Sequence, residues 1–201
     1  MEQPTDSGLI ASGGRVAYRV SNPQDRDVHG VLWGACGLKP GAGLPQWARV
    51  HPQRQRRAMG GQRCQVCAEA ADVNNDGVLW LLDGTLPSEG TITTHPPVCR
   101  RCPRKAVRAC PPLRNKGHTL VRVKAPVLEG VYGRLYLPSR THRSGLKPGE
   151  HAYVPYADAS RTRWVVAEQL YATLHGCTPV NLDDLAADGS ETEPILCLAT
   201  D

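Results

Sequence analysis

Two pairs of cysteines stand out in the sequence, because each has the two-residue gap that suits a bound metal ion. Cys64 and Cys67 form the first pair, Cys99 and Cys102 form the second, and 31 residues separate the pairs. Two thiolates at this spacing can occupy one edge of a tetrahedral zinc site, in which each Zn–S bond is about 2.3 Å long. We therefore predict a Zn²⁺ ion held by these four cysteines. The alternative is two unrelated pairs of buried thiols.

The residues around the two pairs fit such a site. Four thiolates around Zn²⁺ carry a net charge of −2, which neighbouring arginines can offset. These arginines are Arg63, Arg100, Arg101 and Arg104. Four further cysteines have no partner at ligand spacing and are predicted to be structural. They are Cys36, Cys110, Cys177 and Cys197.

The elements expected to position the ligands lie between and after the pairs. The run Asn74-Asn75-Asp76-Gly77 predicts a tight turn, and the apolar residues 78–82 after it predict a strand. Pro103 suits the first turn of a short helix, which Pro111-Pro112 would end. The order of knuckle, hairpin and helix resembles the treble-clef zinc finger over about residues 63–113. That resemblance implies knuckle ligands at Cys64 and Cys67 and helix-start ligands at Cys99 and Cys102, although Pro103 departs from the usual pattern by delaying the helix.

The distribution of basic residues along the chain suggests a negatively charged binding partner. Residues 1–163 hold 24 basic and 12 acidic side chains, net +12, whereas residues 164–201 hold seven acids and no Lys or Arg. The candidate nucleic-acid contacts are Arg54, Arg56, Arg57, Arg100, Arg104, Lys105 and Arg108. A solvated face is the alternative, because Arg outnumbers Lys 19 to 5, as GC-rich codon usage alone would give. An acidic protein is the other candidate partner, and the acidic tail, folded over the basic face, would compete with either.

Catalysis has weaker support. The HNH nucleases share the treble-clef scaffold, but they place a histidine pair or an Asp-His pair on the first hairpin strand. Here His95, Asn115 and His118 lie after that position, so the sequence assigns no catalytic residue and a nuclease ranks third. A calcium-loop pattern over residues 72–83 has Asp rather than Glu at its last position, and the hairpin turn explains the same residues. No phosphate-binding glycine loop, G-x-S-x-G elbow or HExxH motif is present.

The remaining chain predicts a small sheet and one long helix. Residues 15–20 and 28–33 are strand-like on either side of a turn and predict a hairpin, and residues 119–138 predict further strand. A short basic helix is predicted to open at Pro52. From Asp158 to about His175, apolar residues recur at three- and four-residue steps, which predicts a helix. The expected fold class is α+β: a treble-clef zinc finger joined to a small antiparallel β-sheet and a C-terminal helix.

These elements are expected to form a single zinc-containing domain over residues 1–186, followed by an acidic, disordered tail over residues 187–201. The chain contains no phenylalanine, so its thin core is expected to depend on zinc.

No secretory signal is visible, which predicts a cytoplasmic protein with reduced thiols. Its longest apolar run, residues 78–82, is too short to span a membrane. The whole chain also resembles actinobacterial proteins of similar length, a likeness that implies no activity. The sequence thus favours a zinc-binding, nucleic-acid-binding regulatory protein, with a structural or protein-interaction zinc module as the alternative.

Overall fold

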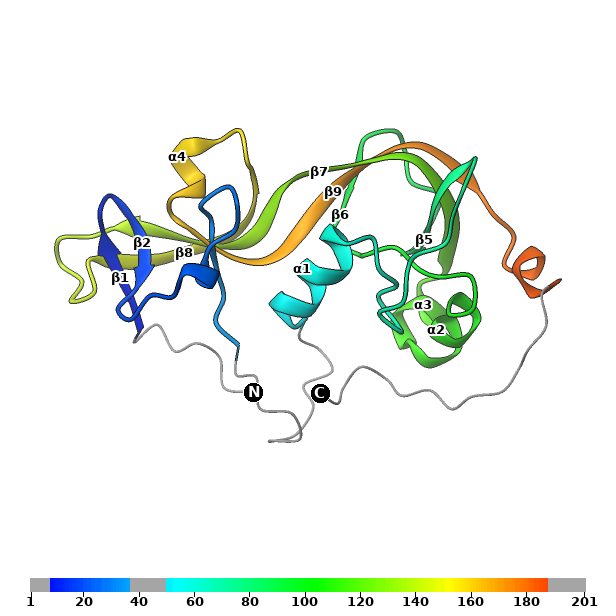
Figure 1. Ribbon diagram of the computed structural model, residues 1–201, viewed down its shortest axis with the longest axis horizontal. Helices are drawn as coiled ribbons and strands as arrows, with labels where there is room; N and C mark the ends of the chain where they lie inside the picture. The colour runs from blue at the N-terminus through cyan, green and yellow to red at the C-terminus, as the bar shows by residue number, and fades with distance from the viewer. Residues whose placement is uncertain (1–7, 37–49, 188–201) are drawn as a thin grey trace. The chain divides into compact units, whose positions relative to one another are not determined.

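The computed structural model describes residues 8–36 and 50–187, and most of the regular structure there is β-strand (Figure 1). The elements are β1 (Leu9–Ser12), β2 (Arg15–Tyr18), η2 (Pro23–Asp25), β3 (Leu32–Trp33), α1 (Pro52–Gly60), β4 (Val73–Asn74), β5 (Gly77–Asp83), β6 (Thr91–Thr93), α2 (Pro103–Ala109), α3 (Pro111–Asn115), β7 (His118–Pro138), β8 (Leu146–Pro155), α4 (Ala159–Thr162), β9 (Val165–Pro179) and η3 (Asp183–Ala187). Strands β3, β9, β7, β5 and β4 follow one another across a seven-stranded sheet, with β6 paired to β9 and β8 to β7. Strands β1 and β2 form a second, two-stranded sheet.

The expected fold class is wrong. The sheet is large and mixed, because β3 runs parallel to β9 while the pairs β4–β5, β5–β7, β6–β9 and β7–β8 are antiparallel. The expected helix over residues 158–175 is absent. Only the one-turn helix α4 and then β9 occupy that stretch. Residues 165–167 and 170–174 are buried, and a strand buried on both faces reads as an apolar run in which helical spacings occur by coincidence. The β-branched residues Val165, Val166 and Thr173 favour the strand.

The expected hairpin between residues 15–20 and 28–33 is also wrong. Strand β2 pairs instead with β1, with Ser12 opposite Arg15. The two residues between them, Gly13 and Gly14, have φ values of 57° and 71°, as the favoured two-residue hairpin turn requires. The expected helix at Pro52 and strand at residues 78–82 are confirmed as α1 and β5.

The chain divides into two compact units, and each is built from two segments. Unit 1 comprises residues 1–55 and 129–171, and unit 2 comprises residues 56–128 and 172–201. The single domain expected over residues 1–186 stays a prediction. The expected acidic tail, residues 187–201, lies outside the described residues except for Ala187.

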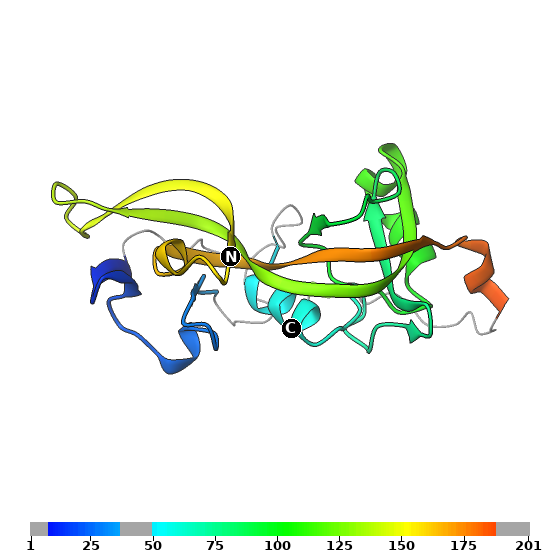
Figure 2. The same cartoon turned by 90° about the horizontal axis from the view of Figure 1, so that it is seen from above.

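Unit 1 has its own apolar core between the β1–β2 hairpin and the paired ends of β7 and β8, which Figure 2 shows side by side up to their connecting loop. Its buried residues are Leu9, Val16, Leu32, Tyr136, Leu146 and Val166. Tyr18 packs on this core and links the end of β2 to the end of β3. Its hydroxyl donates to the Trp33 carbonyl at 3.0 Å and accepts from the Ala35 N–H at 2.7 Å. Burial raises the pKa of Tyr18 to about 12.

A buried glutamine completes the backbone pairing of β9 in unit 1. The Gln55 side-chain amide donates to the Leu170 carbonyl at 2.8 Å and accepts from the Leu170 N–H at 2.7 Å. Gln55 is only 5% exposed. Its amide therefore takes the place of one residue of a neighbouring strand, and it satisfies two backbone groups that would otherwise be buried without partners.

Unit 2 is organised around β5, in which every residue except the last is buried. Strand β5 pairs antiparallel with β4 on one side and with β7 on the other. Gly77, at the start of β5, has a φ of 120° and lies against the Val123 backbone so closely that any Cβ would collide with it. Only glycine fits there, so the turn expected over residues 74–77 is confirmed as the β4–β5 connection.

Candidate metal centre

The four predicted ligands come together in unit 2. The sulfur atoms of Cys64, Cys67, Cys99 and Cys102 all lie within 4.8 Å of one another. Cys64, Cys99 and Cys102 are buried, and Cys67 is half-buried. This cluster could hold a metal ion, and it is the one such group of His, Cys, Asp or Glu found within residues 8–36 and 50–187.

The first cysteine pair sits in a tight backbone turn just after α1. The Ala68 N–H donates to the Cys64 carbonyl at 2.9 Å, which closes the turn around the pair. The Val66 N–H points at the Cys64 sulfur, with 3.4 Å between nitrogen and sulfur. Ala68 has a φ of 61°, a left-handed conformation that an alanine adopts only when its surroundings require it. The turn thus aims both sulfurs to the same side.

The second pair is held by the sheet and by the start of α2. The Val98 N–H donates to the Leu79 carbonyl on β5 at 2.9 Å, which fixes the backbone before Cys99. Cys102 occupies the N-cap position of α2, and its carbonyl accepts from the Ala106 N–H at 2.9 Å. Pro103 is the first helical residue, so the helix starts one residue after the last ligand, as the sequence predicts.

The two arms of the site are joined directly. The Gln65 N–H, inside the first pair, donates to the Pro97 carbonyl at 3.0 Å, just before the second pair. The cysteines also belong to the apolar core of unit 2. The buried members of that core are Cys64, Leu79, Leu81, Val98, Cys99, Cys102 and Leu120. The cluster is therefore part of the core packing of unit 2.

The thiols influence one another's ionisation. The Cys102 and Cys99 thiols hydrogen-bond to the Cys64 sulfur, and they lower the pKa of Cys64 by stabilising its thiolate. The bond to Cys64 in turn raises the pKa of Cys102, and burial acts in the same direction. Protein groups alone thus favour one thiolate among the neighbouring thiols. Binding of a divalent cation would favour all four thiolates.

A buried ion pair braces the hairpin beside the cluster. The Arg122 guanidinium, on β7, forms an ion pair with the Asp72 carboxylate and also donates to the Asp72 carbonyl at 3.1 Å. Asp72 in turn donates its N–H to the Val98 carbonyl at 3.0 Å, next to the second cysteine pair. The Arg122 side chain is only 7% exposed. The sequence did not predict this ion pair, because its two residues lie 50 positions apart.

No known protein family, curated protein or solved structure matches this chain.

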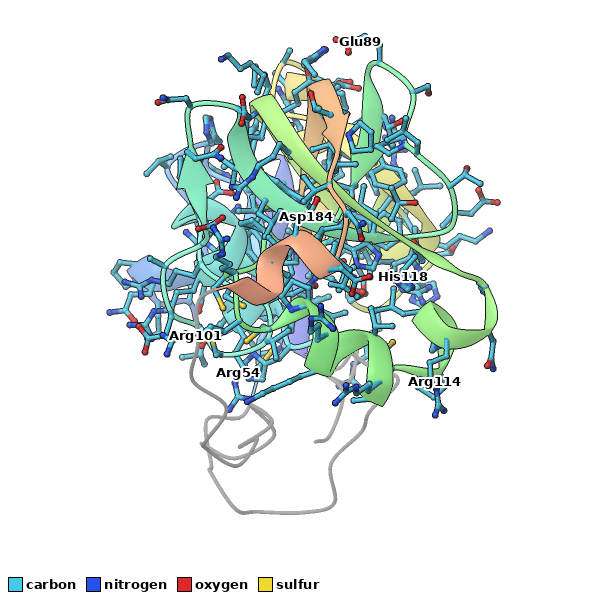
Figure 3. The ribbon with its side chains drawn as sticks, turned by 90° about the vertical axis from the view of Figure 1, so that its right-hand side faces the viewer. Arg54, Glu89, Arg101, Arg114, His118 and Asp184 are labelled. Atoms are coloured by element: carbon cyan, nitrogen blue, oxygen red, sulfur yellow. The ribbon has the colours of Figure 1, made fainter. Side chains whose placement is uncertain are left out.

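The predicted nucleic-acid contacts fall on two helices and the turn before one of them. Arg54, Arg56 and Arg57 lie on α1, and Lys105 and Arg108 are exposed on α2. Two others contact the η3 segment of unit 2. Arg104 forms an ion pair with Asp183 at 2.9 Å, and Arg100 donates to the Asp184 carbonyl at 3.4 Å. Figure 3 shows further basic residues, Arg101 and Arg114, at the surface on the α2–α3 side of unit 2.

The residues considered for the other chemistries are placed elsewhere. His95 lies 3.9 Å from the Asp83 carboxylate, and its carbonyl accepts from the Trp80 indole N–H at 2.6 Å. His118 is the strand partner of Asp83, and Asn115 ends α3. The calcium-loop residues form the β4–β5 hairpin instead, and Asp72 is engaged by Arg122.

The other three cysteines among the described residues take no part in the cluster. Cys36, Cys110 and Cys177 are free and half-buried, and Cys197 lies outside the described residues. None of the helices in the described ranges is long and apolar enough to cross a membrane.

Proposed function

We propose that the cysteine cluster holds a structural zinc ion in a treble-clef type site. The observation that carries this proposal is the distance of 3.7 Å between the Cys67 and Cys99 sulfurs, which belong to different pairs. In a regular tetrahedron the ligand–ligand distance is about 1.63 times the metal–ligand distance, so Zn–S bonds of about 2.3 Å require sulfurs about 3.8 Å apart. The turn, the hairpin and the helix start deliver the ligands in the order that the treble-clef resemblance implies.

The donor set supports a structural role for the ion. Four protein thiolates complete a tetrahedral site, whereas a catalytic zinc ion keeps one position for water or substrate. Three of the four ligands are buried and belong to the apolar core of unit 2. The ion would therefore stabilise unit 2 and fix the start of α2, without taking part in a reaction.

We further propose that the basic residues which this site positions bind nucleic acid. We define the α2 basic face as Arg100, Arg104, Lys105 and Arg108. Arg104 and Arg108 stand four residues apart and so lie on one side of α2. Zinc fixes the backbone at Cys102, one residue before the helix that carries most of this face. A nucleic-acid backbone is a partner that can use such a set of guanidinium and ammonium groups without a matching pocket.

The η3 segment supplies a means of regulation. The Asp183 carboxylate already forms an ion pair with the Arg104 guanidinium. Leu182 and Leu185 pack against the apolar core that contains the cysteines. A nucleic-acid phosphate would have to displace this carboxylate to reach Arg104. Asp183→Asn should therefore tighten nucleic-acid binding by about two- to fivefold, the value of one exposed ion pair. Unchanged affinity would show that η3 does not compete.

The test of nucleic-acid binding is a salt titration of full-length, zinc-loaded protein on fluorescent single- and double-stranded oligonucleotides, followed by anisotropy. If all seven predicted residues contact phosphates, the slope of log K against log salt on duplex DNA is about −6. The triple variant R104Q/K105Q/R108Q should reduce that slope by about 2.7, since each lost contact removes about 0.9. The matched control is R140Q/R143Q/K147Q, which removes three exposed charges from unit 1.

The outcomes separate the two function classes. Equal loss of affinity in the test and control variants would mean that only net charge matters and would refute a specific face. Absence of binding to DNA and RNA at low salt would refute nucleic-acid binding and favour the alternative, a zinc module whose basic face meets an acidic protein. The zinc content, measured on the same samples, tests the metal site independently.

A further inference from the structure

A pocket of about 320 Å³ opens in unit 1, away from every residue discussed as a ligand or nucleic-acid contact. Three segments line it: the Gly13-Gly14 turn with Arg15, the loop around His29, and the end of α4 with Thr162 and Arg163. The volume is at the lower end of the range for small-molecule sites. These segments are separate in the sequence, so no sequence motif predicts the pocket.

The lining is positively charged. It contains two guanidinium groups, one imidazole and one hydroxyl, and no carboxylate side chain. In the described part of the chain, no ion pair engages Arg15 or Arg163, although the Arg163 Nε donates to the Ala159 carbonyl at 3.0 Å. Burial and the nearby charge of Arg15 both lower the pKa of Arg26. Two guanidinium groups in the lining of one pocket, with no carboxylate side chain beside them there, favour an anionic ligand.

The walls are held in place by hydrogen bonds and ring stacking within unit 1. Arg26 donates to the Gly30 carbonyl at 2.8 Å and to the Val16 carbonyl at 2.6 Å, which joins the His29 loop to β2. The Val16 N–H donates to the Arg163 carbonyl at 2.9 Å, which joins β2 to the end of α4. The His29 ring stacks on Tyr156 with 3.7 Å between ring centres.

A single carboxylate organises the loop that carries His29. Asp27 accepts hydrogen bonds from the His29 and Val31 N–H groups, both at 3.0 Å, and from the Tyr156 hydroxyl at 3.2 Å. The loop is thus fixed by these hydrogen bonds, and none of the bonds found among the described residues uses the imidazole nitrogens of His29. A site whose walls are already ordered loses little entropy when it binds its ligand.

We propose that this pocket binds the phosphate group of a phosphate ester, with Arg15 and Arg163 as the charged contacts and His29 and Thr162 as further hydrogen-bond partners. Guanidinium groups match the oxygens of phosphate through paired N–H donors. The volume leaves room for a sugar or a single nucleotide beside the phosphate. The ester is therefore either a small phosphorylated metabolite or the phosphorylated end of a nucleic acid.

The test is a titration of ¹⁵N-labelled, full-length, zinc-loaded protein with ribose 5-phosphate, followed by amide chemical shifts, with ribose as the uncharged comparison. Shifts at residues 13–15, 29–30 and 162–163 with the phosphate, and none with ribose, are the expected result. R15Q/R163Q should raise the Kd at least tenfold, and Thr162→Val at least twofold. Arg140→Gln, an exposed arginine of the same unit outside the pocket, should leave the Kd within twofold.

A parallel titration identifies the source of the phosphate. A dinucleotide with a 5′-phosphate is compared with the same dinucleotide without it. Tighter binding of the phosphorylated dinucleotide than of ribose 5-phosphate assigns the pocket to nucleic-acid ends, and the reverse order assigns it to metabolites. Equal shifts with ribose and ribose 5-phosphate, or an unchanged Kd in both R15Q/R163Q and Thr162→Val, would overturn the proposal. The pocket lies in unit 1, so failure here leaves the metal site and the α2 basic face untouched.

Discussion

Replacing one cluster cysteine, Cys99→Ser, tests the metal site most directly. Cys99 is 9% exposed, and its sulfur lies 3.7 Å from that of Cys67, so serine in its place removes a ligand and leaves the packing nearly unchanged. Structural zinc sites contribute about 10–16 kcal/mol, so one of four ligands accounts for about 2.5–4 kcal/mol. We therefore expect zinc affinity to fall by a factor of about 60 to 800.

The assay is competition for zinc against a chromophoric chelator, which measures affinity even when unit 2 is partly unfolded. Thermal unfolding followed by circular dichroism accompanies it. The total contribution of the ion is comparable with the whole stability of a typical domain, about 5–15 kcal/mol, so removal of zinc by a chelator should unfold unit 2. Cobalt substitution gives a further readout, because tetrahedral Co²⁺ with four thiolates is intensely coloured.

The matched control is Cys110→Ser, a half-buried free thiol at the end of α2 that lies outside the cluster. It should bind zinc with unchanged affinity. If Cys99→Ser and Cys110→Ser bind zinc equally well, or if the native protein carries less than about half an equivalent of zinc after preparation without chelators, the assignment is refuted.

Three further substitutions test the contacts that hold the fold. Gln55→Ala should cost about 2–4 kcal/mol in urea unfolding, because it leaves the N–H and C=O of Leu170 buried without partners; a loss below about 0.5 kcal/mol would contradict the pairing. Arg122→Ala should cost about 1–3 kcal/mol by the same measurement, because it removes the partner of the half-buried Asp72 carboxylate, and Arg122→Lys should recover only part of that loss. Tyr18→Phe should cost about 1–2 kcal/mol and should remove a phenol that ionises near pH 12 from an absorbance titration at 295 nm. Because folding raises the pKa of this phenol, its contribution to stability is fully present below about pH 10 and is lost as the pH rises to about 12; a native protein whose tyrosines all ionise near pH 10 would contradict this reasoning.

Local signals in the sequence were sufficient to predict the elements around the cysteine cluster. The Asn-Gly turn chemistry, the apolar run of β5 and the helix-starting Pro103 all act within a few residues, and the structure has the elements that they predict. The cysteine spacing likewise identified all four members of the cluster. Short-range geometry decides these features, so one sequence suffices to read them.

Features that depend on distant partners could not be read in the same way. The identity of β9 as a strand depends on its neighbours in the sheet, β3, β6 and β7, which pair with its two edges and come from distant parts of the chain. Gln55 meets Leu170 across 115 positions, and neither residue type signals the contact. The Gly13-Gly14 hairpin is different, because two adjacent glycines are a local turn signal, but the four-residue strand β1 before them is too short to show a clear strand pattern.

The segments of the two units alternate along the chain, and this has a consequence for the order of events during synthesis. Residue 102 completes the set of four cysteines, whereas unit 1 is complete only at residue 171 and unit 2 needs residues beyond it. Strand β6 must likewise wait for β9, which is made more than 70 residues later. These four thiols are thus accessible in the nascent chain before either unit can close. If they bind zinc as we propose, the ion is the first long-range link in the nascent chain, around which the later strands assemble.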